Sequence, residues 1–374
     1  MEIRLFKKDE TAMYMKAIDQ IWKKGHILSR DQTLLDFMFY NNPMHEKYIG
    51  KENYGAIGVW EDGKIIGIGG LMLYEFNVNG KRELSSNITN IIVLEEYRKS
   101  MAGVLIYGKI LELYPIFCSF GVGLSNFAMR ISPPTITKDY VMQPIHKLIR
   151  MIGIFSKKKT TEVLLEGNEY LLRNYNEIQK FPQHGNKIVN QDLDEEKWNT
   201  FYYTHIAPKT IGVSRNYEFL NWRYLNHPTF EYLVYTVQDQ LGNYEGLLVA
   251  RVERIVNNTA KILRIVEFIS KNQDASITLA NKIVEIGSEK DVLFADFYCT
   301  TDMFNFGLES VGFKKEFTSE DDQLVLPSRF QPVDLSVVNL NAVMSFYGKK
   351  VRRLNLFDNN IYFTKGDSDQ DRPN

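Results

Sequence analysis

The stretch from Asn90 to Leu105 joins an apolar run to a basic, glycine-containing loop. Ile91–Leu94 are expected to end a strand, Arg98 to Gly103 to form a loop, and the residues up to about Leu113 to form a helix. The start of a helix leaves backbone N–H groups without intrahelical partners, and the helix dipole adds partial positive charge there. Because phosphate groups suit such a position, we expect this loop to bind a phosphate or pyrophosphate.

The spacing Arg98-x-x-Met101-x-Gly103 resembles the acyl-CoA pyrophosphate loop of the GNAT acyltransferase superfamily, with Met101 in place of the first glycine. The resemblance implies that acetyl-CoA or a related acyl-CoA is the co-substrate and that the acyl group passes to an amine. It also implies that the end of the preceding strand binds the pantetheine arm through its backbone, with an N–H near Val93 as the oxyanion donor; a plain buried strand is the alternative. The residues assigned to the cofactor on this basis are Ile92, Val93, Leu94, Arg98, Lys99, Ser100, Met101, Ala102, Gly103, Val104 and Asn126. For Asn126, capping of the following helix is an equally good account.

The general base of the reaction is expected outside the strand that precedes the loop. Acyl transfer from a thioester to an amine needs positioning, a base and stabilisation of the oxyanion. The strand before the loop offers polar residues but no carboxylate, namely Ser85, Ser86, Asn87, Thr89 and Asn90, and Glu83 at its start is expected to lie on the surface. We therefore take Asp369 and Asp367, in the alternating aspartates of the C-terminus, as the candidate catalytic residues.

Two further segments bear on the acceptor. Both resemble segments of GNAT-type proteins that are encoded with surface-polysaccharide enzymes. The first is Trp222-Arg223-Tyr224 with His227-Pro228, and the second is the final Asp367-x-Asp369-x-Asp371-Arg372-Pro373. The resemblance implies an amino sugar or nucleotide sugar as acceptor, and alternating aspartates with an arginine suit an ammonium and hydroxyl groups. The candidate acceptor-binding residues are Asn90, Trp222, Arg223, Tyr224, Asp371 and Arg372. A helix face that ends before Pro228 and a disordered acidic tail are the alternatives for the two segments.

The elements that must position these residues occur twice. In the first half, strands at 55–60 and 65–76 flank an Asp62-Gly63 turn and precede a strand at 84–94, the helix and a strand at 115–122. In the second half, strands at 232–237, 245–255 and 260–269 precede a helix at 275–287 and a strand at 292–299. We interpret this as an internal duplication, and two unrelated α+β domains are the alternative.

The predicted fold class is accordingly α/β (α+β), with two tandem GNAT-like domains, each a mixed, mostly antiparallel central sheet flanked by helices. The expected divisions are an acyl-CoA-binding domain at 1–154, a linker at 155–192, a degenerate GNAT-like domain at 193–330 and an extension at 331–374 that packs back near the active cleft. The loop Ser270–Ser276 has neither Gly nor Arg, so we expect the first copy alone to bind the cofactor.

Bulk composition narrows the function classes. The 374 residues are 44% hydrophobic and carry a formal net charge of −1, which argues against nucleic-acid partners. The two cysteines lie in apolar runs and no leader or spanning segment is recognised, so we expect a cytoplasmic protein without stable membrane insertion. The six histidines lack metal-ligand spacing, so we expect no metal site. The predicted activity is acyl-CoA-dependent N-acyl transfer; the alternatives are an aminoacyl transferase of the peptidoglycan-bridge type and a non-catalytic binding module with a decayed GNAT site. The oligomeric state is left open.

Overall fold

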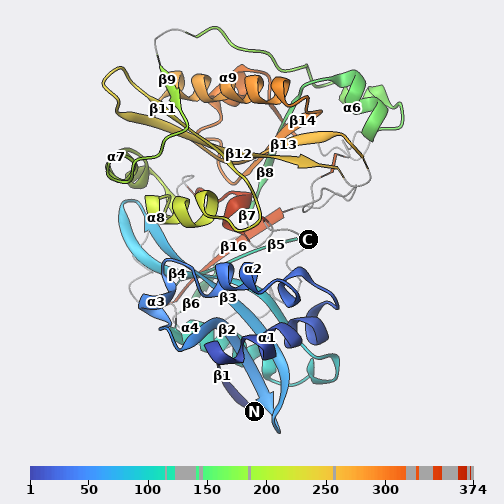
Figure 1. Cartoon of the computed structure of the whole chain (residues 1–374), viewed down its shortest axis with the longest axis vertical. Helices are drawn as coiled ribbons and strands as arrows, with labels where there is room; N and C mark the ends of the chain where they lie inside the picture. Colours follow the sequence, from blue (N-terminus) through green and yellow to red (C-terminus); the bar gives the residue numbers. More distant parts are fainter. Residues whose placement is uncertain are drawn as a thin grey trace.

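The structure, a computed structural model, describes residues 1–113, 116–122, 140–142, 146–183, 187–255, 258–316, 326–327, 340–347, 361–368 and 371. These residues form two sheets that lie at opposite ends of the long axis of the molecule (Figure 1). The C-terminal residues 361–368 lie between the two sheets and form hydrogen bonds with both halves.

The first sheet is mostly antiparallel and contains the strand that leads into the predicted cofactor loop. In spatial order its strands are β1 (Glu2–Lys7), β2 (Asn53–Glu61), β3 (Lys64–Val78), β4 (Lys81–Val93), β5 (Ile116–Val122), β16 (Leu340–Tyr347) and β6 (Tyr140–Met142), with β10 (Ile211–Val213) paired to β3 and β7 (His146–Lys147) paired to β16. Among these described strands, β4 and β5 are the parallel neighbours. The Asp62-Gly63 turn connects β2 to β3, as the sequence predicts, and both turn residues have positive φ.

Side chains of β3 alternate between two cores, as period-two strands do. Met72 and Tyr74 face the cluster that contains Tyr14 of α1 (Thr11–Ala17) and Phe39 of α2 (Gln32–Phe39), whereas Leu73 packs with Ile106 of α4 (Ala102–Leu113). The short α3 (His45–Tyr48) follows α2. The sheet is thus covered by α1 and α2 on one face and by α4 on the other.

The second sheet repeats this arrangement. Its spatial order is β15 (Lys314–Lys315), β8 (Ile149–Ile154), β14 (Phe294–Cys299), β13 (Lys261–Ser270), β12 (Tyr244–Arg254), β11 (Leu233–Gln238) and β9 (Ile188–Asn190). β13 and β14 are parallel and are joined by the helix α9 (Gln273–Glu289), as β4 and β5 are joined by α4. The other helices of this half are α6 (Lys157–Leu164), α7 (Glu195–Phe201), α8 (Tyr217–Leu220), which continues into a π-helical turn (Asn221–Leu225), and α10 (Phe306–Ser310).

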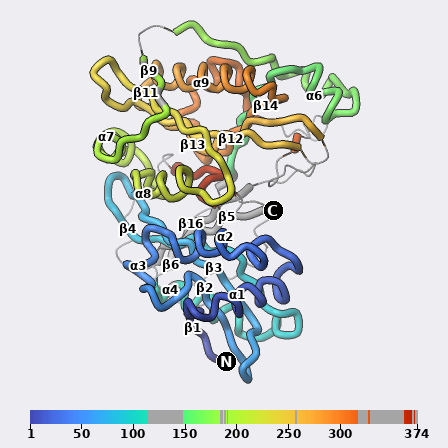
Figure 2. The backbone as a smooth tube through the Cα atoms, viewed as in Figure 1, coloured from blue at the N-terminus to red at the C-terminus, as the bar shows by residue number. Residues whose placement is uncertain are grey.

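The chain passes between the two sheets more than once, which Figure 2 lets the reader follow. β8 pairs with β14 of the second sheet, although it precedes the residues 155–192 that the sequence marks as a linker. β16 pairs with β5 of the first sheet, although it lies near the other end of the sequence. Residues 155–192 themselves contain α6 and β9. The domain boundaries at 154, 192 and 330 stay a prediction. The structure shows in addition that β8 and β16 each pair with the sheet of the other half.

Buried ion pairs hold the C-terminal segment in place. The Arg215 guanidinium, 1% exposed, donates from Nε to Glu267 at 3.0 Å and from Nη2 to Asp367 at 2.7 Å. Arg251 forms a second buried pair with Asp371. Burying a charge is costly unless it is paired, so these contacts fix the segment at the junction of the two halves.

The Arg215 contacts lead to a stability prediction. Arg215→Met leaves Glu267 and Asp367 buried without their guanidinium, and loss of one partner of a buried pair costs about 3–5 kcal/mol. We expect the free energy of unfolding, measured in urea, to fall by about that amount. The matched control is Lys159→Met, which removes a surface pair with Asp291 whose side chains are 53% and 74% exposed and should change unfolding little. Equal effects of the two variants would contradict the assignment.

Candidate functional site

A bulge interrupts β4 just before the predicted cofactor loop. Asn90 has a φ of +56°, which non-glycine residues rarely adopt. The register with β3 shifts at this point, since Thr89 pairs with Gly70 and Ile92 with Ile68, so Asn90 and Ile91 together oppose Gly69. A bulge bends a strand and increases its twist, and it commonly lies beside a functional site.

β4 and β5 separate close to this bulge. The two strands pair in parallel over Ser85–Asn87 against Ile116–Cys118, and no later residue of β4 pairs with β5 in the described part of the chain. From Ile88 onward the described pairing of β4 is with β3 alone. The edge of β4 that faces β5 therefore presents backbone N–H and C=O groups that require partners. A ligand with its own amide groups can supply them.

The loop after β4 has the character that the sequence predicts. Arg98 and Lys99 are exposed, Ser100 caps the start of α4 by accepting a hydrogen bond from the Ala102 N–H at 3.2 Å, and Gly103 is buried in the first turn. Met101 is 58% exposed. The N–H groups of the first turn and the exposed Arg98 and Lys99 can bind an anion at this end of α4, and Glu96 in the turn before them is paired with Lys64. The cofactor residues Ile92 to Val104 thus lie on one continuous stretch, and their binding role stays a prediction.

A row of buried polar side chains continues from the bulge along one face of β4. Ser85, Asn87 and Thr89 alternate along the strand and are no more than 4% exposed. The Ser85 Oγ, Asn87 Oδ1 and Thr89 Oγ1 have no hydrogen-bond partner among the described residues. They share the face of their β3 partners Tyr74, Met72 and Gly70, whereas Ser86 lies on the α4 face with Leu73. Buried polar atoms without partners are rare, so this row indicates a bound ligand or water.

The C-terminal candidates come together at the near end of this row. The carbonyl oxygen of Asp367 accepts hydrogen bonds from the Tyr74 hydroxyl at 3.2 Å and from Asn87 Nδ2 at 3.1 Å. Arg223 donates to the carbonyl oxygens of Gly366, Ser368 and Asp371. The Tyr224 hydroxyl donates to Glu267 at 2.6 Å. Among the described residues, no hydrogen bond or ion pair joins this group to the loop at Arg98.

The two described aspartates of this group differ in their electrostatic environment. Burial raises the pKa of Asp367 above its ordinary value despite the neighbouring Arg215. Burial also opposes ionisation of Asp371, but Arg251 and Arg223 outweigh it and lower the pKa to about 2. Asp371 is therefore a fixed anion, and Asp367 is the more basic of the two. Asp369, Arg372 and Asn126 lie outside the described residues.

The corresponding place in the second sheet is occupied by the chain itself. β13 and β14 pair over Leu263–Ile265 and Ala295–Phe297 and show no further pairing in the described residues. The segment Ile361–Thr364 lies at the end of this pair, where the Thr300 N–H donates to the Phe363 carbonyl at 3.0 Å. The Tyr362 hydroxyl accepts from the Phe268 N–H at 3.3 Å and donates to Glu267 at 2.9 Å. The Asn272 side chain caps α9 by accepting from the Ala275 N–H at 2.9 Å, as Ser100 caps α4, so the two sites differ at the strand ends.

Several residues of this region were not anticipated from the sequence. They are Tyr74, Arg215, Arg251 and Glu267, all buried and all in contact with the C-terminal segment directly or through one partner. The sequence contains an indication for two of these four residues, because Arg251 and Glu267 are charged residues inside apolar strands. Tyr74 carries no such signal, because tyrosine is common in strands.

Within the ranges described, no three His, Cys, Asp or Glu side chains come together as a metal-binding group. None of the described helices is long and apolar enough to cross a membrane.

Comparison with known proteins gives a likeness of structure. No protein-family model and no curated protein sequence matches the chain. A GCN5-related N-acetyltransferase from Anabaena variabilis has a TM-score of 0.53 and 14% identity, over 92% of this chain and 72% of that one. A conserved protein of unknown function from Enterococcus faecalis, described as a probable N-acyltransferase, has a TM-score of 0.52 and 13% identity over 92% and 71%. Saccharomyces cerevisiae N-myristoyltransferase, solved with bound myristoyl-CoA, has a TM-score of 0.50 and 12% identity over 93% and 83%.

These likenesses span nearly the whole chain, and the predicted α+β class with mixed, mostly antiparallel sheets flanked by helices is confirmed. At such low identity they establish the fold alone, which is that of the GCN5-related N-acetyltransferases.

Proposed function

We propose that the protein is an acyl-CoA-dependent N-acyltransferase whose first sheet binds the acyl-CoA. The observation that carries this proposal is the separation of β4 from β5 at a bulge, directly before a basic loop at the N-terminus of α4. The edge of β4 beyond Asn87, which pairs with no other described strand, suits the amide groups of a pantetheine arm, and the loop suits a pyrophosphate. The structural neighbours, which include proteins described as N-acyltransferases, support the same chemistry.

The proposed reaction is a direct transfer. The amine nitrogen attacks the thioester carbonyl carbon, the C–S bond breaks, CoA leaves as a thiolate that takes up a proton, and the proton lost by the amine passes to a base. A backbone N–H at Ile91–Val93 would stabilise the oxyanion. Leu94 is a poorer donor for this purpose, because its N–H already donates to the Ile66 carbonyl oxygen at 2.9 Å.

We place the acceptor amine on the polar face of β4. Ser85, Asn87 and Thr89 offer hydroxyl and amide groups whose hydrogen bonds are incomplete among the described residues. An acceptor rich in hydroxyl groups, such as an amino sugar, would complete them, and the resemblance of the segments at Trp222 and at the C-terminus to surface-polysaccharide proteins points the same way. We assign the base to the C-terminal aspartates, because the segment that carries them contacts Asn87 through Asp367.

The first test concerns the cofactor loop. Gly103→Gln places a long side chain in the first turn of α4, where the pyrophosphate backbone contacts are proposed, so acetyl-CoA affinity should fall at least about tenfold, which is about 1.4 kcal/mol. Isothermal titration calorimetry measures the change. Gly108→Gln is the matched control, because it lies in the same helix and a Cβ there meets no atom within 4 Å. Equal acetyl-CoA affinity in the parent and Gly103→Gln would refute the assignment.

The second test concerns the polar row. The Thr89 hydroxyl has no partner among the described residues, so Thr89→Val should leave the melting temperature nearly unchanged. Loss of one hydrogen bond to the acceptor should raise its KM about three- to tenfold. Ser86→Ala is the control, because Ser86 also lacks a partner but faces α4. If both variants keep the parental KM, the acceptor lies elsewhere.

The third test separates the two candidate bases. A general base contributes about a hundredfold or more to the rate, so Asp369→Asn should lower kcat by that factor while acetyl-CoA affinity is kept. Asp367→Asn is the comparison, since it also removes the Arg215 ion pair and should lower the melting temperature. A fully active Asp369→Asn enzyme would exclude Asp369 as the base.

A further inference from the structure

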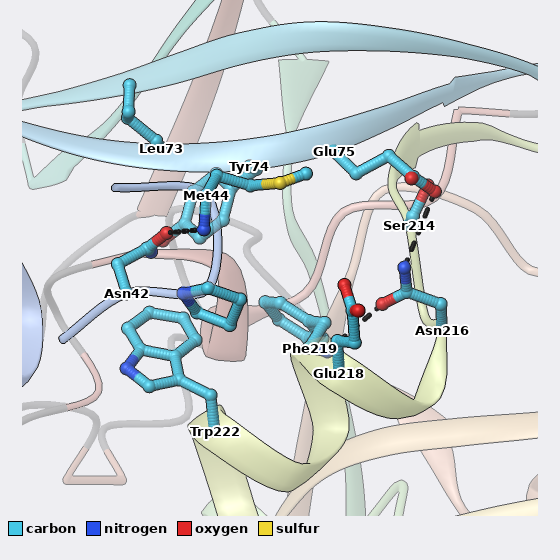
Figure 3. A pocket seen from close by; sticks show the side chains of 11 residues that line it. Asn42, Met44, Leu73, Tyr74, Glu75, Ser214, Asn216, Glu218, Phe219 and Trp222 are labelled. Atoms are coloured by element: carbon cyan, nitrogen blue, oxygen red, sulfur yellow. Dashed lines mark hydrogen bonds between the residues drawn. The ribbon is translucent and has the colours of Figure 1, made fainter. Parts of the chain in front are cut away.

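A groove runs along the seam between the two halves, away from the separated strands. It has a volume of about 570 Å³ and is lined from the first half by Phe37 and Pro43 and from the second by Glu218, Asn221 and Trp222. Volumes of this size are ordinary for small-molecule sites. A smaller pocket of about 20 Å³, enough for one small polar group, shares Pro43, Glu218 and Trp222 with the groove (Figure 3).

The smaller pocket contains a buried donor without an acceptor. Asn42, 5% exposed, accepts a hydrogen bond from the Met44 N–H through Oδ1 at 2.9 Å, and this contact fixes the orientation of its amide. Its Nδ2 has no partner among the described residues. A buried amide donor without an acceptor costs free energy, so the pocket favours a ligand that brings an oxygen to this point.

Two carboxylates complement this donor. Glu75 accepts from the Tyr203 hydroxyl at 2.8 Å, and Figure 3 shows its side chain beside Asn216 and Ser214. The Glu218 side chain is exposed, and its carboxylate makes no hydrogen bond or ion pair with any described residue. Carboxylates bind hydroxyl or ammonium hydrogens. A ligand for this place must therefore carry both oxygen acceptors and O–H or N–H donors.

The charge of the lining restricts the ligand further. None of the described residues that line the groove or the pocket is a lysine, arginine or histidine. A phosphate group would face the carboxylates of Glu75 and Glu218, which is unfavourable, and Arg82, whose Nε lies 3.9 Å from Glu75 Oε1, is not among the residues that line either cavity. The indole of Trp222 is held in place, because its Nε1 donates to the Phe37 carbonyl at 3.0 Å and its ring stacks on Phe37. Only 7% of Trp222 is exposed, so it contributes a rigid apolar edge to the wall beside the polar groups.

We propose that this groove binds a phosphate-free saccharide, with a ring against Pro43 and the exposed edge of Trp222 and a hydroxyl or amine group in the pocket between Asn42 and Glu218. Tyr74 connects this site to the transfer site, since it lines the pocket and is the cross-strand partner of Ser85, the first member of the polar row. The saccharide is then the body of the acceptor, an assignment that rests on the proposed acyl transfer. It favours a free or polymer-linked amino sugar over a nucleotide-linked one.

The test uses a β-1,4-linked glucosamine trisaccharide as the probe and the full chain, with binding followed by calorimetry. Glu218→Gln should weaken binding about threefold or more, and Glu218→Lys should weaken it further because the probe is cationic. Glu289→Lys, at an exposed glutamate at the end of α9, is the matched control and should leave the affinity unchanged. The N-acetylated trisaccharide probes Asn42: Asn42→Asp keeps the acceptor for Met44 but removes the donor, and should weaken binding about threefold.

The outcomes separate this proposal from the proposed function. A trisaccharide that does not bind, that binds all variants equally, or that binds less tightly than UDP-glucosamine would overturn the groove assignment. Acetyl-CoA binding, measured in the same samples, should be the same in the parent and in Glu218→Lys. A protein that binds the trisaccharide in the groove but never binds acetyl-CoA would keep the groove proposal as a saccharide site and refute the acyltransferase.

Discussion

The pairing of buried guanidinium and carboxylate groups is the constraint on which the arrangement of the two halves depends. Arg215 and Arg251 hold Asp367 and Asp371, and Arg223 binds the backbone between them. Because an unpaired charge cannot be buried cheaply, the C-terminal segment has one favourable position. That position brings Asp367 to Tyr74 and Asn87 of the first sheet and Tyr362 to β13 of the second. The polar face of β4 adjoins the segment fixed in this way, through Asn87 and its neighbour Tyr74.

The two sheets share one arrangement of strands and helix, but the space between the separated strands is filled differently in each. In each, a pair of parallel strands joined by a helix separates after a short paired stretch. In the second sheet the chain's own residues 361–364 satisfy the strand ends, and Asn272 caps α9 as Ser100 caps α4. In the first sheet no described segment lies at the corresponding strand ends, and the loop before α4 exposes Arg98 and Lys99. The separation of the parallel strands suits a ligand in the first half, whereas in the second half the chain's own residues fill it.

Local patterns were enough to predict most of the strands and helices. The Asp62-Gly63 turn, the alternation along β3 and the helical period of α9 each depend on neighbouring residues, which a sequence displays directly. The exchange of β8 and β16 depends on which strand edge is free, and that is a property of the finished sheets. The Asn90 bulge, the partnerless Asn42 amide and the contacts of Tyr74 likewise arise from chain segments far apart in sequence, so residue types alone could not reveal them.

The position of β16 has a consequence for biosynthesis. Domains generally fold from the N-terminus while the chain is still being made. Here β5 obtains its partner along one edge from Leu340–Tyr347, so the first sheet must wait for nearly the whole polypeptide before that edge is covered. Until then the nascent chain carries an open strand edge, which is a template for pairing with other chains. A fragment that ends after β5 would therefore be prone to aggregation, and no single cut in the sequence separates the two sheets, because β8 and β16 each pair in the sheet of the other half.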